Sequence, residues 1–382
     1  MTNEDAPPLR DVAIVGGGPV GMLLACLLLQ RGIDAVVLER RPVPATRPRA
    51  FGVHPPGLAV LDAAGVGDAV RAAAAVIRVG TASSAGRTLA RIPFAARPIR
   101  SLEQDRTEAI LRARLGELDP RALHPGAEVT TVRDLGDRVE LGVADETGEA
   151  RHAARLVVGA DGIRSVVRAA IGAAWLPRRG AGEYAMADTR RGAEPADVAV
   201  LRLEPAGVVE SFPLPLGGRR WVARLPARPD VLDPAAFAGI VESRTGVRLD
   251  LDAMSPPSLF TARQHVARPF ARGRIALVGD AAHELSPIGG QGMNLGWLDA
   301  ARLDAAIAAA LAGRAPAAQA LARYAAERRA AAGRAMRRAA FNMAMGAEVS
   351  GVSRLGRDAL VGALGLPGLR RLFADAFAMR GL

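Results

Sequence analysis

The sequence predicts a mixed α/β fold that begins with a parallel-sheet unit, continues into an antiparallel sheet and ends in helices. Three observations lead to this prediction. Residues 11–40 contain an apolar strand, a glycine-rich turn, an apolar helix and a second apolar strand. Residues 183–226 contain short apolar stretches broken by Gly and Pro, which is typical of antiparallel strands. From Leu298 onward the chain is rich in alanine, the best helix former.

The composition indicates a chain with a large core and no membrane span. It has 382 residues, of which 50% are hydrophobic, and no apolar run reaches the roughly 18 residues that cross a bilayer. The polar N-terminus is unlike a signal peptide, so a cytoplasmic location is expected. Because Cys26 is the only cysteine, an intrachain disulfide and a thiolate metal cluster are excluded. We interpret Cys26 as a small core residue and expect no metal.

The positive charge of the chain does not point to nucleic acid. The formal net charge is +11, but the chain contains no lysine, and its arginines are scattered along its length. We therefore expect no nucleic-acid partner. The lack of lysine also excludes Schiff-base chemistry and a phosphate-binding P-loop.

The first motif is a G-x-G-x-x-G turn between the strand and the helix of residues 11–40, formed by Gly16, Gly18 and Gly21. Gly16 permits a tight turn, Gly18 lets the backbone approach a pyrophosphate, and Gly21 lets the helix pack on the strand. The helix N-terminus offers N–H groups and a partial positive charge to phosphates. Glu39 ends the next strand, close to the expected spacing of about 20 residues, and can accept hydrogen bonds from a ribose. The motif alone does not separate FAD from NAD.

Two later segments also join a strand to a helix through a glycine turn. RLVVGADGIRSVVR, residues 155–168, contains Asp161 and Gly162. ALVGDAAHELSPIGGQGMNLGWLDA, residues 276–300, places Asp280 at the end of a strand and Pro287 before a run of glycines.

In order and spacing, the three segments resemble the single-component flavoprotein aromatic hydroxylases, the para-hydroxybenzoate hydroxylase-like class A monooxygenases. The likeness covers residues 12 to about 300. It implies non-covalent FAD, with NADH or NADPH as a transient reductant that has no Rossmann domain of its own. It also implies a Rossmann-like FAD-binding domain with an inserted antiparallel-sheet substrate domain and a helical C-terminus. The expected boundaries are 1–80, 100–180 and 268–300 for the FAD-binding domain, 81–99 and 181–267 for the substrate domain, and 301–382 for the C-terminal helices.

The resemblance also assigns roles to residues. Asp280 is expected to bind the ribityl chain, and Pro287 to lie over the flavin ring as the candidate at the catalytic face. The turn and helix start after it, Gly289 to Asn294, would serve the pyrimidine end of the ring, where a helix N-terminus stabilises negative charge. Arg49, together with Arg47, is placed near the dinucleotide. The predicted cofactor-binding residues are Gly16, Gly18, Pro19, Val20, Gly21, Glu39, Arg40, Arg49, Gln104, Val129, Asp161, Asp280, Gly290, Gly292, Met293 and Asn294.

The expected reaction is hydroxylation of an electron-rich phenolic or polyketide-type ring by NAD(P)H and O2, through a flavin hydroperoxide. A base would assist by forming the phenolate, and Tyr184, His54 and His265 are candidates among which the sequence does not choose. His283 is interpreted as a packing or capping residue. A halogenase is disfavoured by the absent lysine and by the wide spacing of the tryptophans. A reductase of isoprenoid double bonds and a non-catalytic FAD-binding protein stay open as alternatives.

The last segment, residues 336–382, combines apolar positions at near-helical spacing with arginines. Such helices most often pack on their own protein, but a basic amphipathic helix also suits an anionic membrane surface. We therefore expect a hydrophobic phenol as substrate and weak, reversible contact with the inner face of a membrane. Whether the chain is a monomer or a homodimer is left open.

Overall fold

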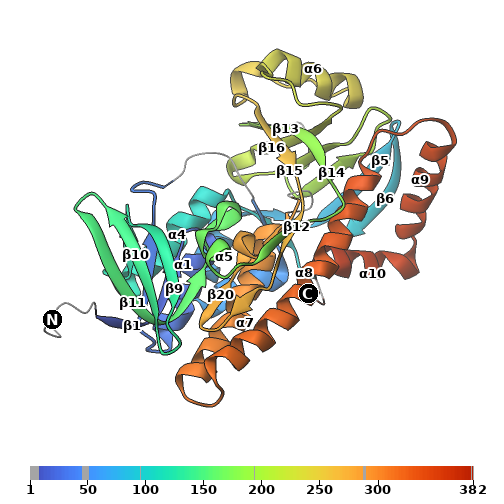
Figure 1. Ribbon diagram of the computed structural model, residues 1–382. Coiled ribbons are helices and arrows are strands. Elements are labelled where there is room, and N and C mark those ends of the chain that lie inside the picture. Colours follow the sequence, from blue (N-terminus) through green and yellow to red (C-terminus); the bar gives the residue numbers. More distant parts are fainter. Residues whose placement is uncertain are drawn as a thin grey trace, which may run out of the picture.

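The computed structural model describes residues 8–44, 51–94, 96–192, 194–286, 290–379 and 381. It confirms the predicted fold class, since a largely parallel sheet with helices packs beside an antiparallel sheet, and helices end the chain (Figure 1). The C-terminal helices are α7 (Gln291–Leu311), α8 (Ala317–Met345), α9 (Gly351–Leu364) and α10 (Pro367–Phe377). Among all the described residues, no helix combines the length and the hydropathy that a membrane span requires.

The first sheet has eight strands, and five of them run parallel in the order β20-β11-β1-β2-β8. Its strands are β1 (Leu9–Val15), β2 (Ala35–Glu39), β8 (Leu123–Pro125), β9 (Glu128–Asp134), β10 (Val139–Asp145), β11 (Gly148–Gly159), β19 (Ala271–Arg272) and β20 (Ile275–Leu277). The central β1 and β2 are buried on both faces over most of their length, which explains their continuous apolar runs. Because the strands are parallel, the segments that follow β1, β2, β11 and β20 meet at one edge.

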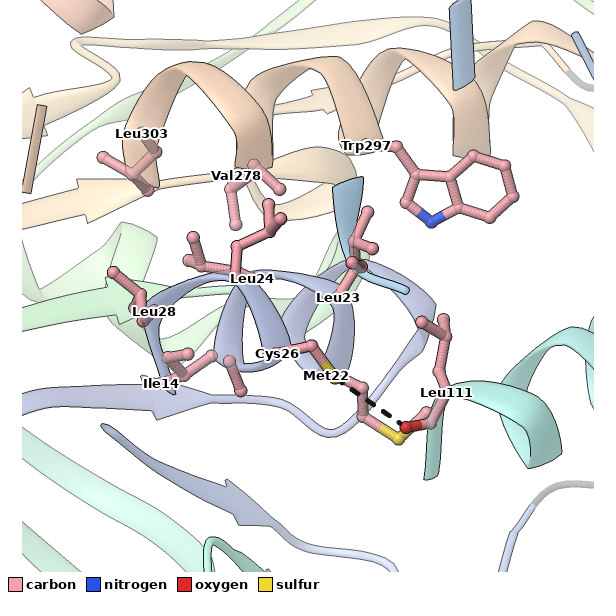
Figure 2. Packing of buried hydrophobic residues seen from close by; sticks show 14 of the residues in the cluster. Ile14, Met22, Leu23, Leu24, Cys26, Leu28, Leu111, Val278, Trp297 and Leu303 are labelled. Carbon is pink, nitrogen blue, oxygen red and sulfur yellow. Dashed lines mark hydrogen bonds between the residues drawn. The ribbon is translucent and has the colours of Figure 1, made fainter. Parts of the chain in front are cut away.

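Helix α1 (Pro19–Gln30) lies under this sheet and is buried along most of its length. Figure 2 shows Leu23 and Leu24 of α1 directed toward Val278 and toward Trp297 of α7, and Met22 directed to the opposite side, toward Leu111. The core interpretation of Cys26 is confirmed, since it is fully buried and its Sγ lies 3.9 Å from the carbonyl oxygen of Leu111. Burial raises the pKa of the Cys26 thiol to about 12, so it stays protonated at neutral pH.

The inserted sheet has seven strands in the order β17-β13-β16-β15-β14-β5-β6. Its strands are β5 (Val79–Ser84), β6 (Arg87–Pro93), β13 (Gly182–Thr189), β14 (Val198–Arg202), β15 (Val209–Pro213), β16 (Arg219–Leu225) and β17 (Ser258–Ala262). All neighbouring strands are antiparallel except β14 and β5, which pair in parallel. This pair joins segments that are far apart in the sequence. One face packs against α6 (Pro234–Thr245), and the other turns toward the first sheet (Figure 1).

Short elements connect the two sheets. Two small sheets hold β3 (Gly52–Val53), β4 (Ala75–Ile77) and β7 (Ile99–Ser101), and β12 (Ala174–Pro177), β18 (His265–Arg268) and β21 (His283–Glu284). The remaining helices of the described chain are α2 (Pro55–Ala63), α3 (Gly67–Ala73), α4 (Gln104–Leu118) and α5 (Val166–Ala170). Helix α8 runs from α7 to the inserted sheet, where α9 and α10 pack against β6 (Figure 1).

A fully buried carboxylate, Asp299 of α7, ties the helices to the end of β20. Its Oδ1 accepts a hydrogen bond of 2.6 Å from Nε of Arg328 in α8, and its Oδ2 pairs with Nε2 of His283 and accepts from the Gly279 N–H at 3.3 Å. Burial alone would raise the pKa of Asp299, but His283 and Arg328 outweigh it and hold that pKa below its usual value. The packing interpretation of His283 agrees with its full burial.

The substitution Arg328→Leu tests this network. It leaves a buried carboxylate short of its counter-charge, so the free energy of unfolding should fall by about 3–5 kcal/mol in urea denaturation. The pKa of Asp299 is lowered in the folded state. The difference in free energy of unfolding between the variant and the unaltered protein should therefore be greatest at neutral pH and should become smaller as the pH falls through that pKa.

The control uses the same pair of helices. Arg302 of α7 and Glu327 of α8 form an exposed pair at 3.1 Å. Arg302→Leu should cost at most about 1 kcal/mol. Equal losses in the two variants would contradict the role given to Asp299.

Candidate functional site

A cavity of about 1000 Å3 lies between the strand-end edge of the first sheet and the inner face of the inserted sheet. This volume is at the upper end of the roughly 300–1,000 Å3 of ligand pockets. Its lining comes from all three sequence motifs, from the inserted sheet and from the C-terminal helices. The cavity is therefore where the predicted cofactor residues and the predicted substrate region meet.

The β1–α1 turn forms one wall through Gly16, Gly18, Pro19 and Val20. A Cβ at Gly16, where φ is +111°, would lie 2.4 Å from the Ala160 carbonyl oxygen, and one at Gly21 would lie 2.0 Å from that of Gly16. The fold itself thus demands glycine at 16 and 21. At Gly18 a Cβ would meet nothing within 4 Å, so space is left there for a ligand.

The electrostatics of this wall suit a dinucleotide. Gly18 is the N-cap of α1 and supplies no side-chain cap, so the positive end of the helix faces the cavity. At the end of β2, the buried Glu39 accepts hydrogen bonds from the Gly17 N–H at 2.7 Å and from Arg41 Nε at 2.8 Å. Burial raises the pKa of Glu39, but these bonds and the Arg41 charge outweigh it, and the net pKa is lowered. Glu39 is therefore an anion with acceptor capacity toward the cavity.

In the second motif, Asp161 lines the cavity but is already engaged by its own loop. It accepts hydrogen bonds from the Ser165 hydroxyl at 2.5 Å and from the Val166 N–H at 2.7 Å. The structure therefore gives Asp161 a local capping role at the start of α5. Its predicted contact with the cofactor stays a prediction.

The third motif enters the cavity through Asp280, Gly290, Gly292 and Met293. Asn294 is placed differently: it is fully buried behind the wall, where its Nδ2 donates to the Gly52 carbonyl at 2.8 Å and its Oδ1 accepts from the His54 N–H. It therefore holds β3 against the start of α7.

The other predicted cofactor residues divide into two groups. Arg40, Gln104 and Val129 line the cavity. Arg47, Arg49, Pro287 and Gly289 lie outside the described residues, so their predicted roles stay predictions.

The structure separates the candidate bases. Tyr184 of β13 and the buried His54 line the cavity. Burial raises the pKa of Tyr184 to about 12, so it remains protonated near neutral pH. His265 does not line the cavity; it stacks on Trp175 and its Nδ1 lies 2.7 Å from Oε2 of Glu284, which does.

Some cavity residues were missed in the sequence analysis. Arg41 lies two residues after Glu39 and forms an ion pair with it. The sequence E-R-R at residues 39–41 could have indicated this pair. Glu210 of β15 lies inside the apolar stretch VVESFPL, where a lone charge marks a special position. Val361, Leu364, Phe373 and Phe377 of α9 and α10 also line the cavity, which only the folding of the tail could reveal.

The residues present fit FAD, and Gly18→Ala tests the fit. The backbone at Gly18 is compatible with alanine and the space is open, so the stability of the FAD-free protein should change by less than about 1 kcal/mol. FAD affinity should fall at least tenfold, because the new methyl group occupies the approach to the helix N-terminus. Fluorescence titration of the FAD-free protein measures this affinity.

Gly116→Ala is the matched control, because its Cβ also meets nothing within 4 Å but it lies in α4 outside the cavity. It should leave FAD affinity unchanged. Full retention of FAD affinity by Gly18→Ala would show that the pyrophosphate binds elsewhere.

Comparison with known proteins agrees with this geometry. A family model described as an FAD binding domain matches residues 10–339. A 12-dehydrotetracycline 5-monooxygenase/anhydrotetracycline 6-monooxygenase of Streptomyces rimosus is 33% identical over 324 residues, which cover 79% of this chain and 63% of that protein. A ubiquinone hydroxylase of Rhodospirillum rubrum is 34% identical over 80% of this chain and 74% of its own length.

The fold is also found in solved structures. The p-nitrophenol 4-monooxygenase of Pseudomonas putida superposes with a TM-score of 0.87 at 23% identity, covering 98% of both chains. The chain spans less than two thirds of the length of the tetracycline monooxygenase that it matches. From the matched family model and the identity to these relatives, the chain belongs to the FAD-binding family of para-hydroxybenzoate hydroxylase-like flavoprotein monooxygenases.

Proposed function

We propose that this protein is an NAD(P)H-dependent monooxygenase that uses FAD and O2 to hydroxylate a large, hydrophobic, electron-rich aromatic substrate. The observation that carries the proposal is the continuity of the cavity, which runs from the dinucleotide-binding turn to an apolar pocket on the inserted sheet. We also propose residues 81–99 and 181–267 as the substrate domain, with the other boundaries as expected from the sequence.

The chain's own residues would hold the cofactor along the edge of the first sheet. The N-terminus of α1, with Gly18, would face the pyrophosphate, and the anionic Glu39 would accept hydrogen bonds from a ribose. Asp280 would take the ribityl chain, and the start of α7 near Gly292 would face the ring. Bound FAD supplies the redox chemistry, because it takes electrons from NADH or NADPH and then transfers oxygen from O2.

The half of the cavity that the inserted sheet and the C-terminal helices line would bind the substrate, and it is mostly apolar. The inserted sheet contributes mostly apolar groups, among them Met186, Leu201 and Phe212, and α9 and α10 add Val361 and Phe377. Side chains of this kind exclude water and position a flat ring against the cofactor edge. No arginine of the inserted sheet is among the described residues that line the cavity, so a substrate carboxylate would lack a partner there.

The names of the relatives support the same substrate class. They are named for 12-dehydrotetracycline and anhydrotetracycline and for ubiquinone, which are bulky ring compounds. A reductase of isoprenoid double bonds and a non-catalytic FAD-binding protein are the competing functions, and O2 consumption separates them from the proposal.

The substrate preference gives a direct prediction. Long-chain alkylphenols or polycyclic phenols should accelerate NAD(P)H oxidation with matching O2 uptake and hydroxylated product, whereas 4-hydroxybenzoate should be a poor substrate. Oxygen-electrode traces with mass spectrometry of the product measure both. NAD(P)H oxidation with a reduced alkene product and no O2 uptake would identify the reductase instead. No turnover with any ring would favour the non-catalytic function.

Weak contact with a membrane surface stays part of the proposal, and the structure narrows the residues involved. Val361, Phe373 and Phe377 face the cavity, so only outward residues of the tail are available. The most exposed apolar ones are Val352, Leu355 and Leu366, at 84%, 62% and 57%. The arginines of α9 and α10 would complement anionic lipid.

Leu355→Gln combined with Leu366→Gln should reduce co-sedimentation with phosphatidylserine-containing vesicles, and added salt should reduce it further. Leu216→Gln is the control, because Leu216 is 97% exposed but lies beside β16, away from the tail. Equal sedimentation of all variants would remove membrane contact from the proposal.

A further inference from the structure

Glu210 is an ionisable side chain that lines the apolar half of the cavity. Glu210 lies in the middle of β15 and is 3% exposed. Its neighbour Val209 packs into the cluster under α6, whereas Glu210 and Phe212 line the cavity. The alternation of side chains along the strand therefore aims this carboxyl group at the substrate half of the cavity.

The position of Glu210 is distinct from that of the other acids in the wall. Glu39, Glu128, Asp161 and Asp280 come from the first sheet and the turns after its strands, and Glu284 comes from β21 of a small connecting sheet. Among the described lining residues, Glu210 is the only acid that the inserted sheet contributes. A buried acid on the substrate side would meet the aromatic ring itself.

The groups around Glu210 leave its charge uncompensated. Its strand partners are Leu201 of β14 and Val222 of β16, both apolar. From β13, Tyr184 interacts with it electrostatically, and Arg224 of β16 is directed at the Tyr184 ring, 5.9 Å from its centroid, and at the Met343 carbonyl. From α8, Asn342 also lines the cavity.

This environment sets the protonation of both groups. Burial, with no offsetting charge, raises the pKa of Glu210 from 4.5 to about 7. Burial and the negative charge of Glu210 raise the pKa of Tyr184 to about 12, with Arg224 opposing. Near neutral pH the carboxyl group can therefore take up or release a proton, while Tyr184 remains a hydrogen-bond donor.

We propose that Glu210 is the catalytic base that deprotonates the phenolic hydroxyl of the substrate. The inference rests on the proposed function. In the step, the substrate O–H bond breaks, its proton forms a new O–H bond on the Glu210 carboxylate, and the electron pair stays on the phenolate oxygen. The phenolate is a stronger nucleophile than the neutral phenol, which favours the oxygen transfer. The proton returns to the product oxygen before release, which restores the carboxylate.

Glu210→Gln tests the step, because it keeps the shape and removes the base. Turnover of weakly acidic alkylphenols at neutral pH should fall about 10²- to 10⁴-fold in kcat. Turnover of 4-nitrophenol at pH 8, where this phenol is largely ionised in solution, should fall much less. The matched control is Glu183→Gln on β13, a half-buried acid that accepts from the Thr261 hydroxyl and does not line the cavity. It should behave as the unaltered protein does with both phenols.

A second measurement needs no turnover. Binding of 2,4-dinitrophenol, which stays ionised over this pH range, to the FAD-loaded oxidised protein should weaken as the pH rises through about 7, because ionised Glu210 then repels the phenolate. In Glu210→Gln this weakening should disappear. Glu210→Gln should also fold, because a glutamate whose pKa is raised destabilises the folded state increasingly between pH 4.5 and about 7, and the amide does not.

The outcomes separate the inference from the proposed function. If the unaltered protein hydroxylates no phenol, the proposed function fails, whatever the variant does. If it hydroxylates phenols but Glu210→Gln loses activity equally for weakly and strongly acidic ones, or loses none, the role of Glu210 as base is overturned. An unchanged pH dependence of 2,4-dinitrophenol binding in the variant would overturn it as well.

Discussion

The buried pairing of Asp299 with His283 and Arg328 is the interaction on which much of the molecule depends. It holds the turn after β20, which carries Asp280, against α7, and it ties α7 to α8. Helix α8 in turn reaches the inserted sheet and leads into α9 and α10, which close the cavity. Charges in this position are costly to desolvate, and each of the three side chains depends on the others for its counter-charge or hydrogen bond.

The cavity combines two different environments because two sheets with different surroundings build it. The strand ends of the first sheet offer helix N-termini, backbone N–H groups and carboxylates, which suit a polar dinucleotide. The inner face of the inserted sheet offers mainly carbon, and among the described lining residues Glu210 is the one acid that it contributes. The same burial that keeps water away from the ring raises the pKa of Glu210 toward neutrality.

Several interpretations made from the sequence took a different form in the structure. Asn294 was expected at the cofactor; in the structure its side chain braces β3 against α7, and its contact with the cofactor stays a prediction. The amphipathic tail was weighed as membrane-binding, but Phe373 and Phe377 turn into the cavity, and Gln291 Nε2 donates to the Phe377 carbonyl at 3.4 Å. An apolar stripe on a helix indicates that this face is buried, but it does not indicate which surface covers it.

The sequence by itself determined the fold class, the FAD-binding family and many of the residues along the strand-end wall of the cavity, because these depend on local patterns. Gly16, Gly21 and Glu39 sit at fixed spacings along a strand–turn–helix–strand unit, and close backbone contacts require the two glycines. Only the tertiary structure decided which groups line the apolar half of the cavity. Glu210, Tyr184 and Phe377 come from strands and a helix far apart in the chain, and their side chains meet only after the inserted sheet and the tail have packed. The pKa of Glu210 followed from that packing, since burial by distant segments is its whole cause.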